Sequence, residues 1–172
     1  MKNNNFNDLK KWILDNFLES KLYDLSKTEM LLLYPKVIEN KVSEIHPDLF
    51  KLPNLKAIAL KIDSNNINIK SKTLHTIYID NNRFESIIID CPNLNSLSMK
   101  NQHQITYNEK KTMVMSDLTI KNLILKTPKL NDLEVTNKII TSDPKTYKLI
   151  KKLKSNLKLS LRQKSVIADN IF

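Results

Sequence analysis

The chain has 172 residues, and among them there is no glycine, one cysteine and one tryptophan. Without glycine, the phosphate-binding loops of Walker and dinucleotide-binding proteins are excluded in their usual form. A single cysteine, Cys91, excludes an internal disulfide and indicates a reducing compartment or indifference to redox. Glycine is also the usual residue at positive φ, so we expect some of the 21 asparagines to fill such turn positions.

Long apolar runs are missing as well. No stretch approaches the roughly eighteen consecutive apolar residues of a membrane span, and no apolar run follows the N-terminal lysine as in a secretory signal peptide. We therefore expect a soluble, cytoplasmic protein. Export by a route that needs no signal peptide stays open.

The sequence offers little for catalysis or metal binding. The three histidines, His46, His75 and His103, share no ligand spacing with one another or with Cys91, whereas a zinc site needs four close N or S ligands. Cys91 has no neighbouring base, and we interpret it as a small side chain at the edge of the core. We predict that the chain is not an enzyme and has no catalytic residues, no cofactor and no metal.

The net charge of +10 is unevenly distributed. Basic and acidic residues number seven and eight in residues 1–50, thirteen and eight in 51–140, and eight and two in 141–172. The basic tail suggests either binding to nucleic acid or an anionic membrane surface, or the solvated face of a terminal cap.

A period near twenty residues organises the middle of the chain. Residues 74–84 read L-x-x-I-x-I-x-x-N-x-F, and the pattern begins again at Leu94. The expected central positions of successive strands are Ile58, Ile77, Leu97, Met113 and Leu133. A second set of extended segments lies between them, at Ile67/Ile69, Ile87/Ile89, Ile105/Tyr107 and Leu123/Leu125.

The strongest internal evidence for repetition is a 36-residue self-match. Residues 84–99 align without a gap on residues 120–135, with apolar matches at seven positions and a shared proline. The separation equals a step of 16 followed by one of 20, which favours counting Met113 as the centre of a repeat.

These motifs resemble the leucine-rich-repeat family, whose strand pattern is L-x-x-L-x-L followed by x-x-N-x-L. Only the copy that begins at Leu74 carries the asparagine in place. The resemblance covers about residues 45–136 and implies an α/β solenoid, a right-handed coil with a parallel β-sheet and short extended segments on its convex side. It also implies a non-enzymatic module that binds a protein partner, in a short divergent form such as bacterial effectors or viral interaction proteins contain.

The flanking segments are predicted to close the ends of this coil. Residues 1–36 are expected to form a helical N-terminal cap, with one helix over 6–23 and a second after the Ser26–Glu29 capping-box pattern, ending before Pro35. The solenoid would then span 37–140. Residues 141–172 are expected to supply a basic capping helix that starts at Asp143-Pro144, and a last strand at 157–161.

The residues between the inward positions of each predicted strand should face outward together. Tyr78 is the one aromatic among them, and it is either an interaction hot spot or a cover for its neighbours. Only Lys61 and Lys100 are basic, too few for nucleic acid on this face. We therefore expect a protein partner to bind here, through Lys61, Thr76, Tyr78, Asp80, Ser96, Ser98, Lys100, Asp132 and Glu134, beside Ala57, Ala59 and Thr136.

Overall fold

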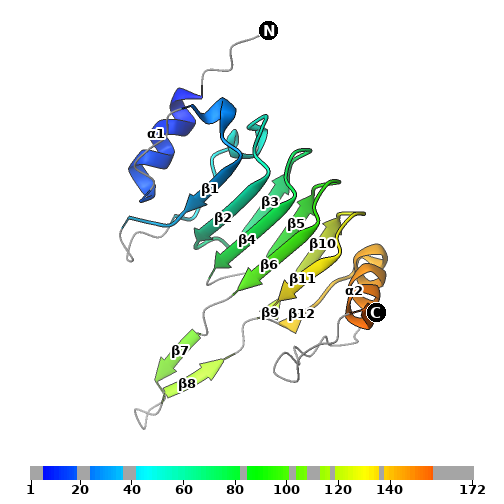
Figure 1. Cartoon of the computed structure of the whole chain (residues 1–172). Coiled ribbons are helices and arrows are strands. Elements are labelled where there is room, and N and C mark those ends of the chain that lie inside the picture. Colours follow the sequence, from blue (N-terminus) through cyan, green and yellow to red (C-terminus); the bar gives the residue numbers. More distant parts are fainter. Residues whose placement is uncertain are drawn as a thin grey trace.

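A computed structural model of the chain describes residues 6–18, 24–36, 42–81, 85–100, 104–107, 113–116, 119–135 and 138–156. Parallel strands form the larger part of the regular secondary structure in these ranges, with a helix at either end (Figure 1). The helices are α1 (Asn7–Asn16) and α2 (Pro144–Asn156), and the short 3-10 turns are η1 (Leu25–Lys27) and η2 (Leu49–Lys51). The predicted α/β class with a parallel sheet is confirmed at this level.

The repeats contribute strands to two parallel sheets. The first sheet has the order β1-β2-β4-β6-β11, and the second has the order β10-β5-β3. Along the chain, the strands from β2 to β6 alternate between the two sheets. The bounds are β1 (Met30–Leu33), β2 (Ala57–Ile62), β4 (Thr76–Asn81), β6 (Ser96–Lys100) and β11 (Asp132–Val135) in the first sheet, and β3 (Asn66–Lys70), β5 (Ser86–Asp90) and β10 (Asn122–Lys126) in the second.

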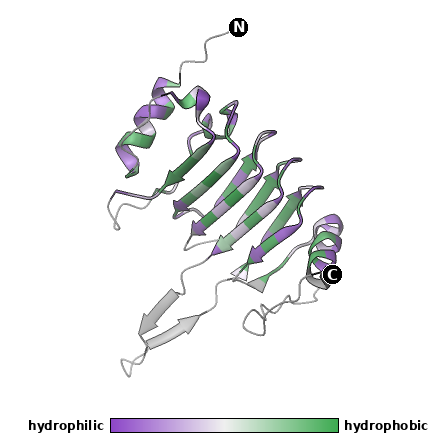
Figure 2. Cartoon of the chain, in the orientation of Figure 1, coloured by the Kyte–Doolittle hydropathy of each residue, from purple (hydrophilic) through white to green (hydrophobic). Residues whose placement is uncertain are grey.

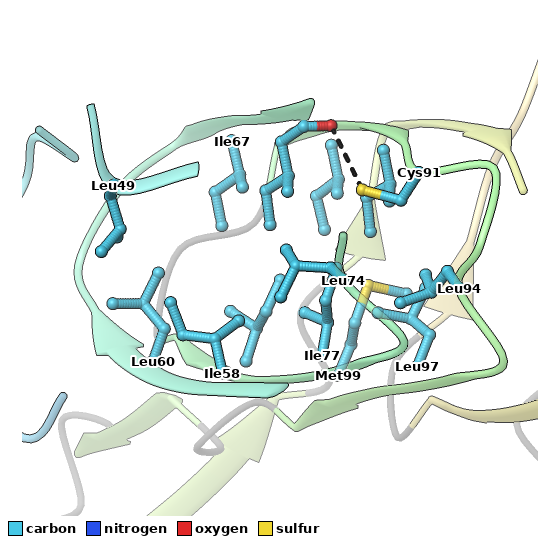
Figure 3. Packing of buried hydrophobic residues seen from close by; sticks show 14 of the residues in the cluster. Leu49, Ile58, Leu60, Ile67, Leu74, Ile77, Cys91, Leu94, Leu97 and Met99 are labelled. Atoms are coloured by element: carbon cyan, nitrogen blue, oxygen red, sulfur yellow. Dashed lines mark hydrogen bonds between the residues drawn. The ribbon is translucent and has the colours of Figure 1, made fainter. Parts of the chain in front are cut away.

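The core lies between the two sheets and is almost entirely aliphatic. Side chains alternate between the faces of a strand, and in β2 the buried positions are Ile58, Leu60 and Ile62. Figure 3 shows Ile67 of the second sheet facing Ile58 and Leu60 of the first. Each such burial stabilises the fold by about 1.5–3 kcal/mol, so the predicted alternation of inward residues accounts for how these strands are held.

Proline recurs in the turns that lead into the first sheet. In three of them, a backbone N–H donates to the carbonyl three residues earlier, at Leu55 to Leu52, Leu94 to Cys91 and Leu130 to Thr127. The second residue of each turn is proline, whose fixed φ suits that position. The asparagine that follows Pro53 or Pro92 also donates a side-chain hydrogen bond to the turn of the preceding repeat, Asn54 to Ser26 and Asn93 to Lys72.

The predicted second helix before Pro35 is wrong, because these residues form β1. Met30 to Leu33 pair with Ala57 to Leu60 in parallel register. The Glu29 carbonyl accepts hydrogen bonds from the backbone N–H groups of Lys56 and Ala57. The Lys56 carbonyl accepts in the same way from His75 and Thr76, where β4 begins. Parallel pairing with β2 satisfies the backbone groups on one side of β1 along its whole length, which an isolated turn of helix cannot do.

Of the other N-terminal predictions, the first helix is present and the capping box is not. The first helix is shorter than predicted, at residues 7–16, and Phe17 then forms an isolated antiparallel bridge with Pro35. Leu9 and Ile13 of this helix are buried. The capping side chain in the next segment is Asp24, which accepts from the Ser26 backbone N–H at 3.0 Å, and the Ser26–Glu29 capping box is not formed.

The prediction that Met113 is the centre of a repeat is also wrong. β8 (Met113–Ser116) pairs antiparallel with β7 (Gln104–Tyr107), so the extended pair Ile105/Tyr107 belongs to this hairpin and not to the second sheet. β6 pairs directly with β11. The 36-residue separation is therefore one repeat of 20 residues plus an insertion of 16. Two repeats of 16 and 20 residues give the same sum, so the spacing alone did not distinguish the two cases.

Helix α2 and a short strand pair lie at the far end of the second sheet. β12 (Lys138–Ile139) pairs with β9 (Thr119–Ile120), and α2 then packs on β10. The Leu125 N–H donates to the buried Thr146 hydroxyl, which donates to the Asp143 carboxylate, so the outer edge of β10 is tied to the start of the helix. The helix predicted from Asp143-Pro144 is thus present, whereas the strand predicted at 157–161 lies outside the described residues.

Candidate functional site

The side of the first sheet that faces away from the core is the candidate site, here called the sheet face. Parallel register places its side chains in rows that cross the strands. The nine predicted residues lie together on this face and are exposed or half-buried. The rows are Met30–Ala57–Thr76–Ser96–Asp132, then Leu32–Ala59–Tyr78–Ser98–Glu134, then Lys61–Asp80–Lys100; Thr136 lies outside the described residues.

The β1 end of the sheet face is apolar. Met30, Leu32 and Tyr34 are 60%, 48% and 39% exposed, and β1 is hydrophobic along its whole length (Figure 2). Ala57 and Ala59 are the next residues in the first two rows. We call the six residues Met30, Leu32, Tyr34, Ala57, Ala59 and Tyr78 the apolar patch.

The residues of β1 were not among those predicted for the site. Met30 and Leu32 point outward yet are as hydrophobic as their buried neighbours Leu31 and Leu33, so the sequence shows no alternation there. The usable signal was the continuous apolar run itself, which is too short for a typical helix and fits a strand.

Tyr78 occupies the centre of the sheet face, between Ala59 and Ser98 in the register. The Lys100 ammonium lies 5.7 Å from the centroid of its ring. Partial burial, followed by the negative charge of Asp80, raises the pKa of the Tyr78 phenol above its usual value near 10. The phenol is therefore neutral at physiological pH and offers a hydroxyl beside a partly exposed ring.

The β11 end of the sheet face is polar and carries more negative than positive charge. Ser96 donates to Asp132 and Ser98 donates to Glu134, each at 2.7 Å. Lys100 lies 3.5 Å from the Glu134 carboxylate, and Lys61 lies 3.8 Å from that of Asp80, further toward β1. Two lysines thus face three carboxylates in the described rows, a net charge of −1 on a protein whose total is +10.

A second cluster of charge lies on α2. Lys145, Lys148, Lys151 and Lys152 are exposed, whereas Thr146, Ile150 and Leu153 are buried. The buried residues hold the helix on the protein, and the lysines face solvent. This helix is the basic surface that the composition of residues 141–172 led us to expect.

The remaining chemical candidates do not converge on a site. In the described ranges, no three or more His, Cys, Asp or Glu side chains are arranged to hold a metal ion, and His103 lies outside those ranges. Cys91 is fully buried, its Sγ is 3.9 Å from the Ile69 carbonyl oxygen, and burial raises its pKa to about 11 (Figure 3). The thiol is therefore protonated at neutral pH and is part of the core.

Comparison with known proteins returned no matching family model, no matching curated protein and no matching solved structure. Among the helices of the described residues, none has the length and hydrophobicity needed to cross a membrane.

Proposed function

We propose that this chain is a non-enzymatic module that binds a protein partner through the sheet face, built as a short leucine-rich-repeat-like solenoid. We further propose that it acts in the cytoplasm.

The repeat geometry supports the solenoid part of the proposal. Ile58, Ile77 and Leu97 are register partners in adjacent parallel strands, and Leu133 follows in the same row. The intervening segments pair in a second parallel sheet, with Ile67, Ile87 and Leu123 in one row. A chain that returns to the same two rows with each repeat is the behaviour expected of stacked repeats.

The observation that carries the binding proposal is the apolar patch. Met30 and Leu32 of β1, and Tyr34 directly after it, are exposed beside the alanines of β2. Tyr78 is half-buried at the far side of this patch. Contiguous exposed apolar side chains with a polar rim are typical of protein interaction sites, and tyrosine is among the residues that contribute most to binding energy. The excess of carboxylates over lysines on the face argues against a phosphate backbone as its ligand.

The test is a quantitative affinity pull-down with wild type and with a Tyr78→Ala/Asp80→Lys double variant. Proteins captured by the wild type through the sheet face should be lost with this variant. The matched control is Ile88→Ala/Asp90→Lys, which makes a similar change at half-buried positions of β5 in the second sheet. It should retain the partners. Unchanged recovery with the Tyr78/Asp80 variant would move the binding site off the sheet face.

The lysines of α2 support a second candidate function, binding to nucleic acid or to an anionic membrane surface. Truncation is a poor test, because α2 also buries Ile150 and Leu153. A Lys145→Gln/Lys148→Gln/Lys151→Gln variant changes exposed residues only. If this function holds, wild type should bind a DNA duplex or phosphatidylserine vesicles with an affinity that falls steeply with salt, and the variant should not bind. Salt-independent binding, or binding that the variant retains, would exclude it.

A further inference from the structure

We propose that the sheet face recognises a basic amphipathic protein segment, whose apolar side chains lie on the apolar patch while a lysine or arginine binds at Asp132. This inference rests on the proposed function and names the chemistry of the partner. It follows from the unequal distribution of apolar and charged side chains between the two ends of one sheet.

The apolar patch supplies the anchor. The side chains of Ala57 and Ala59 are single methyl groups, and they lie in the register between the larger side chains of Met30 and Leu32 on β1 and of Thr76 and Tyr78 on β4. An aliphatic or aromatic partner side chain above the alanines would contact both neighbouring strands. Removing such apolar surface from water contributes about 25 cal/mol for each Å² buried.

Asp132 supplies the charge. It is exposed, and the Ser96 hydroxyl is the only partner that the described residues provide for its carboxylate. Glu134, two residues further along β11, adds a second carboxylate while it accepts from Ser98 and lies near Lys100. A cation that approaches Asp132 therefore meets a negative site, and an anionic partner is repelled.

The spacing between the two features sets the geometry of the partner. Ala57 and Asp132 lie in one row, three strands apart, and adjacent strands are about 4.8 Å apart, so the anchor and the cation should be separated by about 14 Å. This is about nine residues of an α-helix, at 1.5 Å each, or about four residues of an extended chain at 3.3 Å each. A segment of about twelve residues spans the distance in either form.

The experiment is selection of a phage-displayed library of random twelve-residue peptides on the immobilised full chain. We expect the enriched peptides to combine an aliphatic or aromatic residue with lysine or arginine and to carry net positive charge. A synthetic copy of an enriched peptide, followed by fluorescence anisotropy, should bind Leu32→Asp at least about tenfold more weakly and Asp132→Lys at least about fivefold more weakly than wild type. Asp90→Lys, on the second sheet, is the matched control and should bind as the wild type does.

Two further measurements keep the outcome unambiguous. Asp132→Asn removes the charge at nearly constant size, so it should weaken binding in the same direction even if Asp132→Lys perturbs β11, and circular dichroism should show that each variant is folded. Repeating the selection on Asp132→Lys should abolish the preference for basic peptides.

The results also separate this inference from the proposed function. Peptides that are acidic or uncharged but lose binding in Tyr78→Ala would overturn the inference and leave the sheet face as a binding site. Peptides whose binding changes in neither Leu32→Asp nor Tyr78→Ala would overturn both. A selection without any enriched sequence class would also overturn the inference.

Discussion

Leu97 of β6 and Leu133 of β11 are direct register partners in adjacent parallel strands, although 36 residues separate them in the chain. Side-chain contacts between other residues 36 positions apart join the repeat that contains β5 and β6 to the one that contains β10 and β11. They are Ser96 with Asp132, Ser98 with Glu134, Ser86 with Asn122, Asn93 with Lys129 and Glu85 with Lys121. The antiparallel hairpin thus interrupts the sequence of the repeats without interrupting their pairing.

Deletion of residues 101–116 should therefore leave the fold intact. The deletion removes β7 and β8 and reduces the step from Leu97 to Leu133 from 36 to 20 residues, the same step that joins Ile77 to Leu97. Since loop closure depends only weakly on length, we expect a free energy of unfolding within about 1 kcal/mol of wild type, measured by urea denaturation with circular dichroism.

A matched control for this deletion has the same length and a different place. Deletion of residues 85–100 also removes sixteen residues, but these include β5 and β6 and several buried residues of the core. This variant should not give a cooperative unfolding transition. If the deletion of 101–116 behaved in the same way, the hairpin would be a structural part of the stack.

The inward row of the first sheet should dominate stability. Leu97 is completely buried, and Leu97→Ala should lower the free energy of unfolding by about 2–5 kcal/mol because it leaves a cavity. Thr76→Ala, at an exposed position of β4, should change it by no more than about 0.5 kcal/mol. Urea denaturation of both variants tests the assignment, and equal effects would contradict it.

Asp143 should make a contribution to stability that depends on pH. The side-chain and backbone hydrogen bonds from Thr146 lower the pKa of its carboxyl group below the ordinary value of 3.8. A lowered folded-state pKa means that the contribution is fully present above the unfolded value and is lost as pH falls through the folded value. The free-energy difference between wild type and Asp143→Asn should therefore be larger at pH 7 than at about pH 2.5, by urea denaturation.

Thr146→Val provides a second reading of this interaction. It removes the hydroxyl that donates to Asp143 and keeps the size of the side chain. The free energy of unfolding of this variant should fall less between pH 7 and about pH 2.5 than that of the wild type does. A difference between wild type and Asp143→Asn that stays constant with pH would show that the carboxylate has no such role.

Cys91 should resist alkylation in the folded protein. A pKa of about 11, raised by burial, leaves about one thiol in a thousand ionised at pH 8, and the thiolate is the reactive form. Iodoacetamide at pH 8 should leave the native chain unmodified by mass spectrometry and should label it fully in 6 M guanidinium chloride, which serves as the control. Rapid labelling of the native chain would contradict the burial of this residue.

The sequence predicted the interior of the repeats well because burial imposes a strict alternation there. Ile58, Ile77, Leu97 and Leu133 are all in the row that the period indicated, and the predicted residues of the site follow from the same alternation on the opposite face. The inward positions tolerate only aliphatic side chains, so their spacing is visible in one sequence.

The two wrong predictions, at β1 and at Met113, also have physical causes. Met30 and Leu32 are exposed and hydrophobic, so the alternation that marks a strand is hidden in β1, and with it the apolar patch. In the hairpin, Met113 and Met115 alternate with other residues as they would in a repeat strand. Whether such a segment pairs in parallel or antiparallel depends on residues distant in sequence, and the local pattern does not contain that information.

The order of the first sheet also determines how the protein would respond to force. β1 and β11 are its two edges, and α1 and α2 lie at these opposite ends (Figure 1). Tension applied between the two helices acts along the inter-strand hydrogen bonds, so it would load and open one strand interface at a time, like a zipper. Such a molecule would extend under weak force in small successive steps, and its strands would not separate together in a single event at high force.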